Sequence, residues 1–255
     1  MKLRTLGTGS ALCRHPLIPA CFAVETAESF SLIGAPAQAP ARLEALGRSL
    51  DTVDMIAILD QSSAQTAGLE ELYHYFKDRE DKPFLLAPQK LLTAVGNRYM
   101  MQGVNLADGF KIRAVVKAGI HDQHHTEELV WVPHPVGHGY AIRLSASGVF
   151  ITGDCALNED WLFKEMTSEI ILSQCKTTDQ PGEAPTIDDL STLPVYLQNK
   201  IWLYGYHNNY QQSVDPIPML FVPPNAVVFD SERRDKWLLK ERYIRENSKR
   251  ILNNA

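Results

Sequence analysis

Three histidines stand within five residues in the segment HDQHH, residues 121–125. Imidazole is a favoured ligand of zinc, copper and nickel, so this spacing invites a metal site. The flanking residues predict a hairpin tip, where exposed histidines are common and can bind adventitious nickel or zinc without function. We therefore interpret His121, His124 and His125 as a surface cluster, to which the sequence assigns no role.

The cysteines offer little chemistry of their own. Cys13, Cys21, Cys155 and Cys175 lack CxxC spacing, which argues against a disulfide framework and against a structural zinc site. A nucleophilic role for Cys155 or Cys175 requires a base close by, and the sequence does not show one. The turn LGTGSA, residues 6–11, lacks the GK[ST] of a phosphate-binding loop.

The composition narrows the class of protein. The chain has 255 residues and a net charge of −5, with acidic and basic residues mixed along most of its length. This mixture argues against a broad nucleic-acid surface, which needs clustered Lys and Arg. The sequence also shows no signal-peptide pattern and no apolar run as long as a membrane span. We therefore expect a soluble cytoplasmic protein with reduced thiols and neither nucleic acid nor membrane as a partner.

Apolar periodicity predicts a chain of alternating strands and helices. Strands are expected over residues 2–6, 20–33 and 53–60, and the last of these is a nearly continuous apolar run typical of a strand buried on both faces. Helices are expected over 39–47 and 68–81, where apolar residues recur at helical spacing. The segment from Gly109 to Cys155 is strand-like and broken by turn residues, and helix and strand alternate again after it.

This order of elements indicates a single mixed-sheet α/β domain over residues 1–255, because two βαβ-like flanks enclose an antiparallel middle. The end of the sequence, about residues 231–252, predicts an amphipathic helix. The residues available for packing on that helix are Trp237, Leu238, Tyr243 and Ile244.

Six segments resemble, in the same order, the landmarks of the metallo-β-lactamase fold superfamily. They are LGTGSA at 6–11, SLIGAPAQ at 31–38 where the family usually reads LIDCG, LDTVDMIAIL at 50–59, AGLEEL at 67–72, GYAIRLSASGVFITGDC at 139–155 and KIWLYGYH at 200–207. The resemblance covers most of the chain. It implies an αββα sandwich, in which two mixed β-sheets lie face to face and helices flank them.

The same resemblance places the family's first metal motif, HxHxDH, on the segment DQSSAQ. That motif holds two divalent ions and leaves an open position for a bound water, which loses its proton and attacks an ester, amide or phosphodiester. The four ligand positions fall on Asp60, Ser62, Ala64 and Gln65. Asp60 is the only good metal ligand among them, so the resemblance implies a degenerate site with no metal and no other cofactor.

The later landmarks keep part of the ligand set. Asp154 matches the family's bridging aspartate. His134, rather than His138, matches the family histidine that precedes the strand beginning at Gly139. The last ligand position falls on Gly205, with His207 two residues further on and on the same face of a strand. Asp154 and His134 each also fit a purely structural role. Asp154 can accept hydrogen bonds from backbone N–H groups, and His134 can pack against the sheet.

Three functions remain open at this point. The first is a non-catalytic protein with a binding or regulatory role, in which the pocket persists and takes a small-molecule ligand or a protein partner. That partner could be a second copy in a homodimer or an active relative. The second is a phosphodiesterase-like hydrolase with one metal on Asp60, His134 and Asp154. The third is a metal-free enzyme that uses Asp154, His134 or His207 as acid or base. We favour the first, since function must be argued from the site and the first motif is absent.

Overall fold

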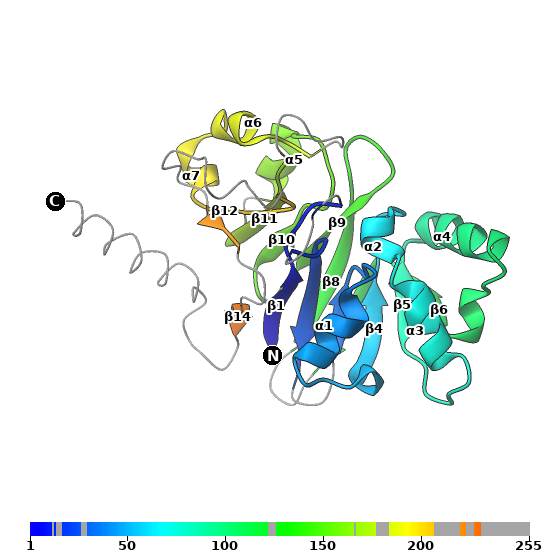
Figure 1. Cartoon of the computed structure of the whole chain (residues 1–255). Coiled ribbons are helices and arrows are strands. Elements are labelled where there is room, and N and C mark those ends of the chain that lie inside the picture. The colour runs from blue at the N-terminus through cyan, green and yellow to red at the C-terminus, as the bar shows by residue number, and fades with distance from the viewer. Residues whose placement is uncertain are drawn as a thin grey trace.

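Two β-sheets lie face to face in the computed structural model of the chain, and helices cover the outer face of each (Figure 1). This is the αββα sandwich that the sequence predicts. The structure describes residues 1–11, 13, 17–26, 30–121, 126–165, 167–176, 184–206, 220–222 and 227–230. The helix predicted for residues 231–252 lies outside this part of the chain.

The first sheet combines antiparallel strands at one edge with parallel strands at the other. Its strands, in spatial order, are β14 (Val227–Asp230), β1 (Lys2–Gly7), β2 (Cys21–Glu25), β3 (Phe30–Ile33), β4 (Val53–Ala57), β5 (Phe84–Ala87) and β6 (Lys111–Ala114). The strand predicted over residues 20–33 is therefore wrong as a single element. It is an antiparallel pair, β2 and β3, in which Glu25 lies opposite Phe30.

The second sheet is mixed in the same way, with antiparallel strands from β7 to β10 and parallel strands from β10 to β13. Its strands, in spatial order, are β13 (Leu220–Phe221), β12 (Ile201–Tyr204), β11 (Ile170–Gln174), β10 (Val149–Ile151), β9 (Tyr140–Leu144), β8 (Thr126–Pro133) and β7 (Lys117–His121).

The helices are short and follow the strands that they cover. They are α1 (Ala39–Ala45), η1 (Leu50–Thr52), α2 (Ser63–Thr66), α3 (Leu69–Phe76), α4 (Gln89–Met101), η2 (Leu106–Asp108), α5 (Glu159–Lys164), α6 (Ile187–Ser191) and α7 (Val195–Gln198). Gly47 ends α1 with a φ of 71°, as expected of a glycine C-cap. No helix in the described ranges is both long enough and apolar enough to cross a membrane.

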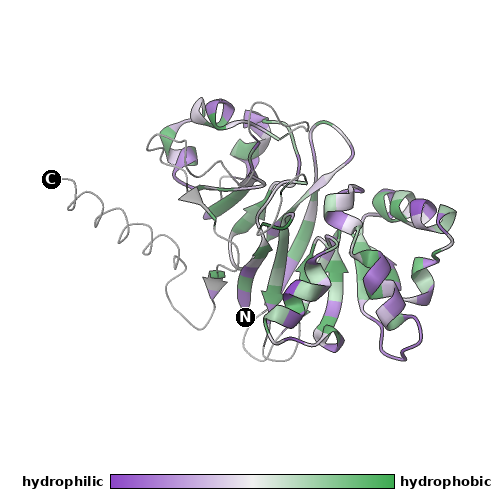
Figure 2. Cartoon of the chain, viewed as in Figure 1, coloured by the Kyte–Doolittle hydropathy of each residue, from purple (hydrophilic) through white to green (hydrophobic). Residues whose placement is uncertain are grey.

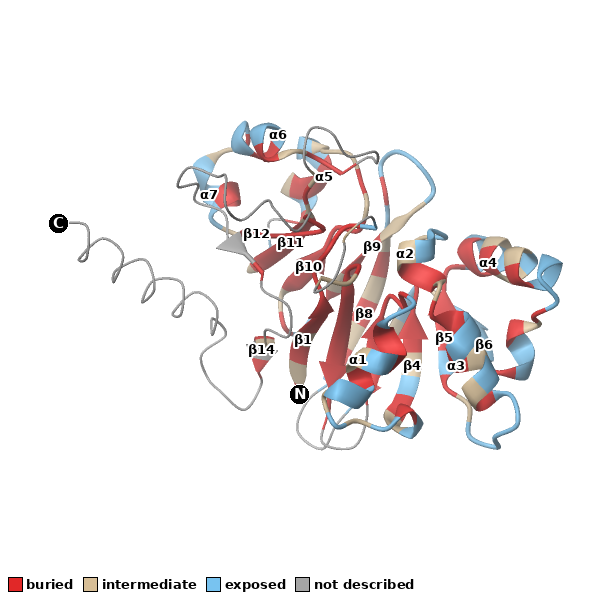
Figure 3. Cartoon of the chain, in the orientation of Figure 1, coloured by how far each residue is buried: buried red, intermediate tan, exposed pale blue. Residues whose placement is uncertain are grey.

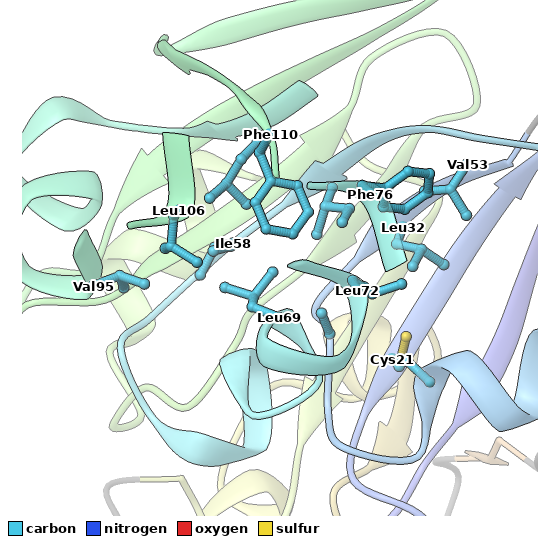
Figure 4. Close-up of a cluster of buried hydrophobic side chains, with 14 of the residues drawn as sticks. Cys21, Leu32, Val53, Ile58, Leu69, Leu72, Phe76, Val95, Leu106 and Phe110 are labelled. Atoms are coloured by element: carbon cyan, nitrogen blue, oxygen red, sulfur yellow. The ribbon is translucent and has the colours of Figure 1, made fainter. Parts of the chain in front are cut away.

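Three apolar cores hold the layers together. One lies between the first sheet and helices α1, α3 and α4, and Figure 4 shows part of it around Leu69, Leu72 and Phe76. The second lies between the two sheets, and the third lies between the second sheet and helices α5 to α7. Figures 2 and 3 show the result, since the strands are hydrophobic and buried while the outer helix faces are polar and exposed. Each fully buried Leu, Ile or Phe stabilises the fold by about 1.5–3 kcal/mol.

Candidate functional site

The segments that resemble metal motifs meet at one end of the sandwich. The Tyr140 N–H donates to the Leu59 carbonyl over 2.8 Å, which ties the start of β9 to the segment that follows β4. Gly139 fits between two of the candidate residues, because a Cβ added there would lie 2.7 Å from His134 Nδ1 and 3.6 Å from Asp60 Cβ. The fold therefore brings Asp60 and His134 together from segments more than 70 positions apart in the sequence.

Asp60 acts locally on the backbone. Its Oδ1 accepts a hydrogen bond from the Ser62 N–H over 2.7 Å, directly before helix α2. A short acidic side chain commonly makes this contact in a turn. The carboxylate is half-buried and positions the segment that corresponds to the family's first metal motif.

His134 is held by the second sheet. Its ring is buried, stacks edge-on against Trp161 at 5.8 Å between centroids, and places Nε2 2.7 Å from the Thr152 carbonyl oxygen. A carbonyl only accepts, so Nε2 carries the proton in this contact. A protonated ring nitrogen has no lone pair for a metal, which leaves Nδ1, facing Gly139, as the remaining donor atom.

Asp154 also bonds the backbone, and the contact reaches a distant segment. Its Oδ1 accepts from the Ala184 N–H over 3.1 Å, which connects the end of β10 to the segment before α6. The side chain is half-buried.

The remaining positions of the first motif differ in their surroundings. Ser62 is exposed, and Ala64 has no donor atom. Gln65 is 9% exposed, and its Oε1 has no hydrogen-bond partner in the described structure. That oxygen lies 2.9 Å from the place where a Cβ on Gly34 would stand. Gln65 therefore extends toward the turn after β3, where the family's LIDCG carries an aspartate.

Gly205 is closed to a side chain by its backbone and by its neighbour. Its φ is +77°, in the left-handed region that residues with a Cβ rarely adopt. A Cβ there would lie 2.4 Å from Gln174 Cγ. The family's last ligand position is thus incompatible with a histidine in this backbone conformation.

The other histidines contribute no site in the described residues. His207, His124 and His125 lie outside them. His138 is exposed, and His121 is an exposed residue whose Nδ1 lies 3.1 Å from Thr126 Oγ1. Within the ranges that the structure describes, no three His, Cys, Asp or Glu side chains are grouped so as to hold a metal ion. The donor set among the described residues therefore does not fit the paired-metal centre that the fold implies.

Tyr204, which the sequence analysis did not single out, takes a central position instead. Its ring is buried between the sheets against Phe22, and its hydroxyl oxygen accepts from the Gly153 N–H over 3.0 Å. Burial raises the pKa of this phenol well above its usual value, and the nearby Asp154 and Asp60 carboxylates raise it further, against hydrogen bonds with Gly153 and Thr152 that lower it. The phenol therefore stays neutral at ordinary pH.

Thr152 joins this tyrosine to the histidine. Its carbonyl accepts from His134, and its Oγ1 accepts from the Gln174 N–H over 3.2 Å while also hydrogen-bonding with the Tyr204 hydroxyl. Strands β8, β10, β11 and β12 are thereby connected at one end of the second sheet. The signal in the sequence was a tyrosine inside the apolar run KIWLYG, since a buried hydroxyl needs a partner.

A small cavity next to this network has a volume of about 10 Å³. Its lining includes Thr152, Cys155, Asn158, Trp161 and Ser173. Ligand pockets usually measure about 300–1,000 Å³, and a space of about 10 Å³ holds a single water molecule. The Trp161 Nε1–H has no partner among the described residues.

Sequence comparison places the chain in a family. The model of the anti-Pycsar protein Apyc1 family matches residues 1–222. The chain belongs to the Apyc1 family. A relative from Paenibacillus xerothermodurans, named anti-Pycsar protein Apyc1, is 25% identical over 232 residues, which are 84% of this chain and 91% of that protein. One from Bacillus phage 010DV004 with the same name is 28% identical over 82% of this chain and 90% of that protein.

Solved structures show which fold this Apyc1-family chain has. A diphosphatase of the PhnP family superposes with a TM-score of 0.68 at 13% identity, over 90% of this chain and 98% of that one. The metallo-β-lactamase fold protein YhfI from Bacillus subtilis superposes with a TM-score of 0.66 at 11% sequence identity, over 89% of this chain and 97% of that one. The short form of human tRNase Z superposes with a TM-score of 0.63 at 12% sequence identity, over 89% of this chain and 98% of that one. The chain therefore has the metallo-β-lactamase fold, which confirms the resemblance noted in the sequence.

Proposed function

We propose that this chain is a non-catalytic member of the Apyc1 family, which works by binding a partner in the process that its relatives' name, anti-Pycsar, describes. One observation carries the proposal: in place of a metal centre, the strand ends are joined by protein hydrogen bonds. His134 Nε2 is engaged by Thr152, Asp154 Oδ1 by Ala184, and Asp60 Oδ1 by Ser62. Catalysis in this fold depends on a metal-bound hydroxide, and these residues offer no place for one.

The first test is metal content and turnover. Protein purified without a histidine tag is expected to hold far less than one zinc, iron or manganese per chain by elemental analysis. It is also expected to leave phosphodiesters and β-lactams intact, with or without added zinc or manganese. A mono-metal or metal-free hydrolase remains the competing function. Turnover that follows the protein through chromatography and disappears in Asp154→Ala would establish that function and overturn ours.

A protein partner fits the site better than a small molecule. The cavity beside Thr152 and Trp161, at about 10 Å³, is far below the size of ligand pockets. The rim of the site, in contrast, presents the exposed loop Pro135–His138, in which Val136 is 60% exposed. We propose that this rim contacts a second chain of the same fold, either another copy or an Apyc1 relative.

Two matched substitutions test that contact. Val136→Asp is expected to weaken association of the chain with itself or with the Paenibacillus relative by at least about tenfold, because a charge would be buried in an apolar contact. Val195→Asp on α7 is the control, since Val195 is 64% exposed and lies away from the site. Sedimentation velocity measures both. Equal affinities for the two variants, or no complex at all, would refute a contact through this rim.

A further inference from the structure

A groove of about 730 Å³ lies at the opposite end of the first sheet from the degenerate site. It is formed where β4 and β5 begin and by the segment that follows α3, at the lower end of the sheet in Figure 1. Apolar side chains form part of its surface: Phe84 is 38% exposed, and its cross-strand neighbour Met55 is partly exposed. Lys111 Nζ lies over the Phe84 ring, 5.7 Å from its centroid.

Carboxylates line the groove without cationic partners. Asp54, Glu80 and Asp81 are exposed lining residues, and no cation in the described part of the chain pairs with them. The nearby cations are otherwise engaged, because Arg79 pairs with Asp51 and Lys82 Nζ donates to the Asp108 carbonyl over 2.6 Å. The lining residues carry four carboxylates and three cations, a net charge of −1, and three of the carboxylates have no ion pair among the described residues. An apolar surface with these carboxylates suits a basic amphipathic segment.

The strand register places the end of β14 at the same end of the first sheet as the groove. Asp230, the last described residue, lies opposite Lys2, Lys2 opposite Glu25, and Glu25 opposite Phe30. Phe30 in turn lies opposite Val53 at the start of β4, and β5 and β6 begin at the same end of the sheet. Asp230, at the end of β14, therefore lies at the end of the sheet that holds the groove. Five strand spacings of about 4.8 Å separate β14 from β5, or about 24 Å.

The sequence after Asp230 has the matching length, charge and pattern. Residues 231–255 contain eight Lys and Arg and four Asp and Glu. The whole chain has 25 Lys and Arg and 30 Asp and Glu, so residues 1–230 contain 17 and 26 of them. The segment is thus +4 and the remainder is −9. The sequence predicts a helix over 231–252, and at 1.5 Å per residue its stretch 242–252 falls about 18–33 Å beyond Asp230. Trp237, Ile244 and Ile251 recur every seven residues and share one face.

We propose that the groove binds the chain's own segment 242–252 in cis. Ile244 and Ile251 contact Met55 and Phe84, and the cations flanking them pair with Asp54, Glu80 and Asp81. Those cations are Arg242, Arg245, Lys249 and Arg250. This inference is independent of the proposed function, because the groove shares no residue with the degenerate site.

Site-specific photo-crosslinking in the full chain tests the proposal. With p-benzoylphenylalanine in place of Ile244, cross-links are expected within one chain to residues 51–55 and 79–84. The same probe in place of Leu239, on the opposite face of the predicted helix, is the control and should give few cross-links there. Charge reversal by Asp54→Lys, Glu80→Lys and Asp81→Lys is expected to lower the yield from position 244 by about tenfold. A matched triple reversal, Asp160→Lys, Asp188→Lys and Glu71→Lys on α5, α6 and α3, should leave it unchanged.

The opposite results are equally clear. Cross-links from position 244 that map elsewhere on the chain would overturn the proposal. A product that migrates as two joined chains would also overturn it, because a second copy would then be the occupant. An equal loss of cross-linking yield from position 244 in both triple variants would show that the contact depends on overall charge rather than on this groove. That result would also overturn the proposal.

Discussion

Zinc binding is expected to appear when Asp60→His, Ser62→His, Ala64→Asp and Gln65→His are introduced together and Gly205 is left unchanged. Residue 60 stands next to His134 in the fold, since both contact Gly139. The introduced imidazoles at positions 60 and 62, with His134 Nδ1, would provide three nitrogen ligands for one ion. The partners that orient such ligands in an intact site are absent, and their loss commonly weakens affinity by about 10–100-fold. We therefore expect one zinc per chain and no appreciable catalysis.

Titration calorimetry would measure this gain in a background where His121, His124 and His125 are replaced by Ala. The parent with the same background is the control, and circular dichroism would establish that both are folded. If the folded variant binds no more zinc than the parent, the correspondence across residues 60–65 is wrong. The non-catalytic function built on it would then lose its basis.

Tyr204→Phe is expected to lower the free energy of unfolding by about 1–3 kcal/mol, because it leaves the buried Gly153 N–H without its acceptor. The change removes one oxygen atom and leaves the packing against Phe22 in place, so the loss reports on the hydrogen-bond network. Urea unfolding followed by fluorescence would measure it. Tyr196→Phe is the control, since Tyr196 is 48% exposed and should change stability little. Equal stability of the Tyr204 variant and the parent would show that the network does not hold these strand ends together.

The fold could be predicted because its signals are local. The continuous apolar run at residues 53–60 and the helical spacing of Leu69, Leu72 and Phe76 each act within one element, and both are found in β4 and α3. The division of residues 20–33 into β2 and β3 was missed, although the polar residues Thr26, Glu28 and Ser29 between them were a turn signal. The strand β5, Phe84–Ala87, was also missed, since only four residues separate a charged loop from the next helix.

The site could be predicted only in part. The sequence indicated that Ser62 is a poor metal ligand and that Ala64 cannot coordinate a metal at all, which follows from residue type alone. It could not show that Gln65 extends toward Gly34 or that His134 Nε2 is held by a backbone carbonyl. Those facts depend on contacts between segments far apart in the chain. Tyr204 was missed for the same reason, because its importance comes from Gly153 and Thr152 on another strand.

The backbone at Gly205 bears on how this chain could evolve. A histidine gained there by mutation would meet a left-handed φ of +77° and the side chain of Gln174, and a non-glycine residue in that conformation costs roughly 1–2 kcal/mol. The mutation would bring no compensating metal affinity while positions 62 and 64 remain Ser and Ala. A histidine at position 205 is therefore expected to be tolerated only together with changes that relax this turn and remove the contact with Gln174.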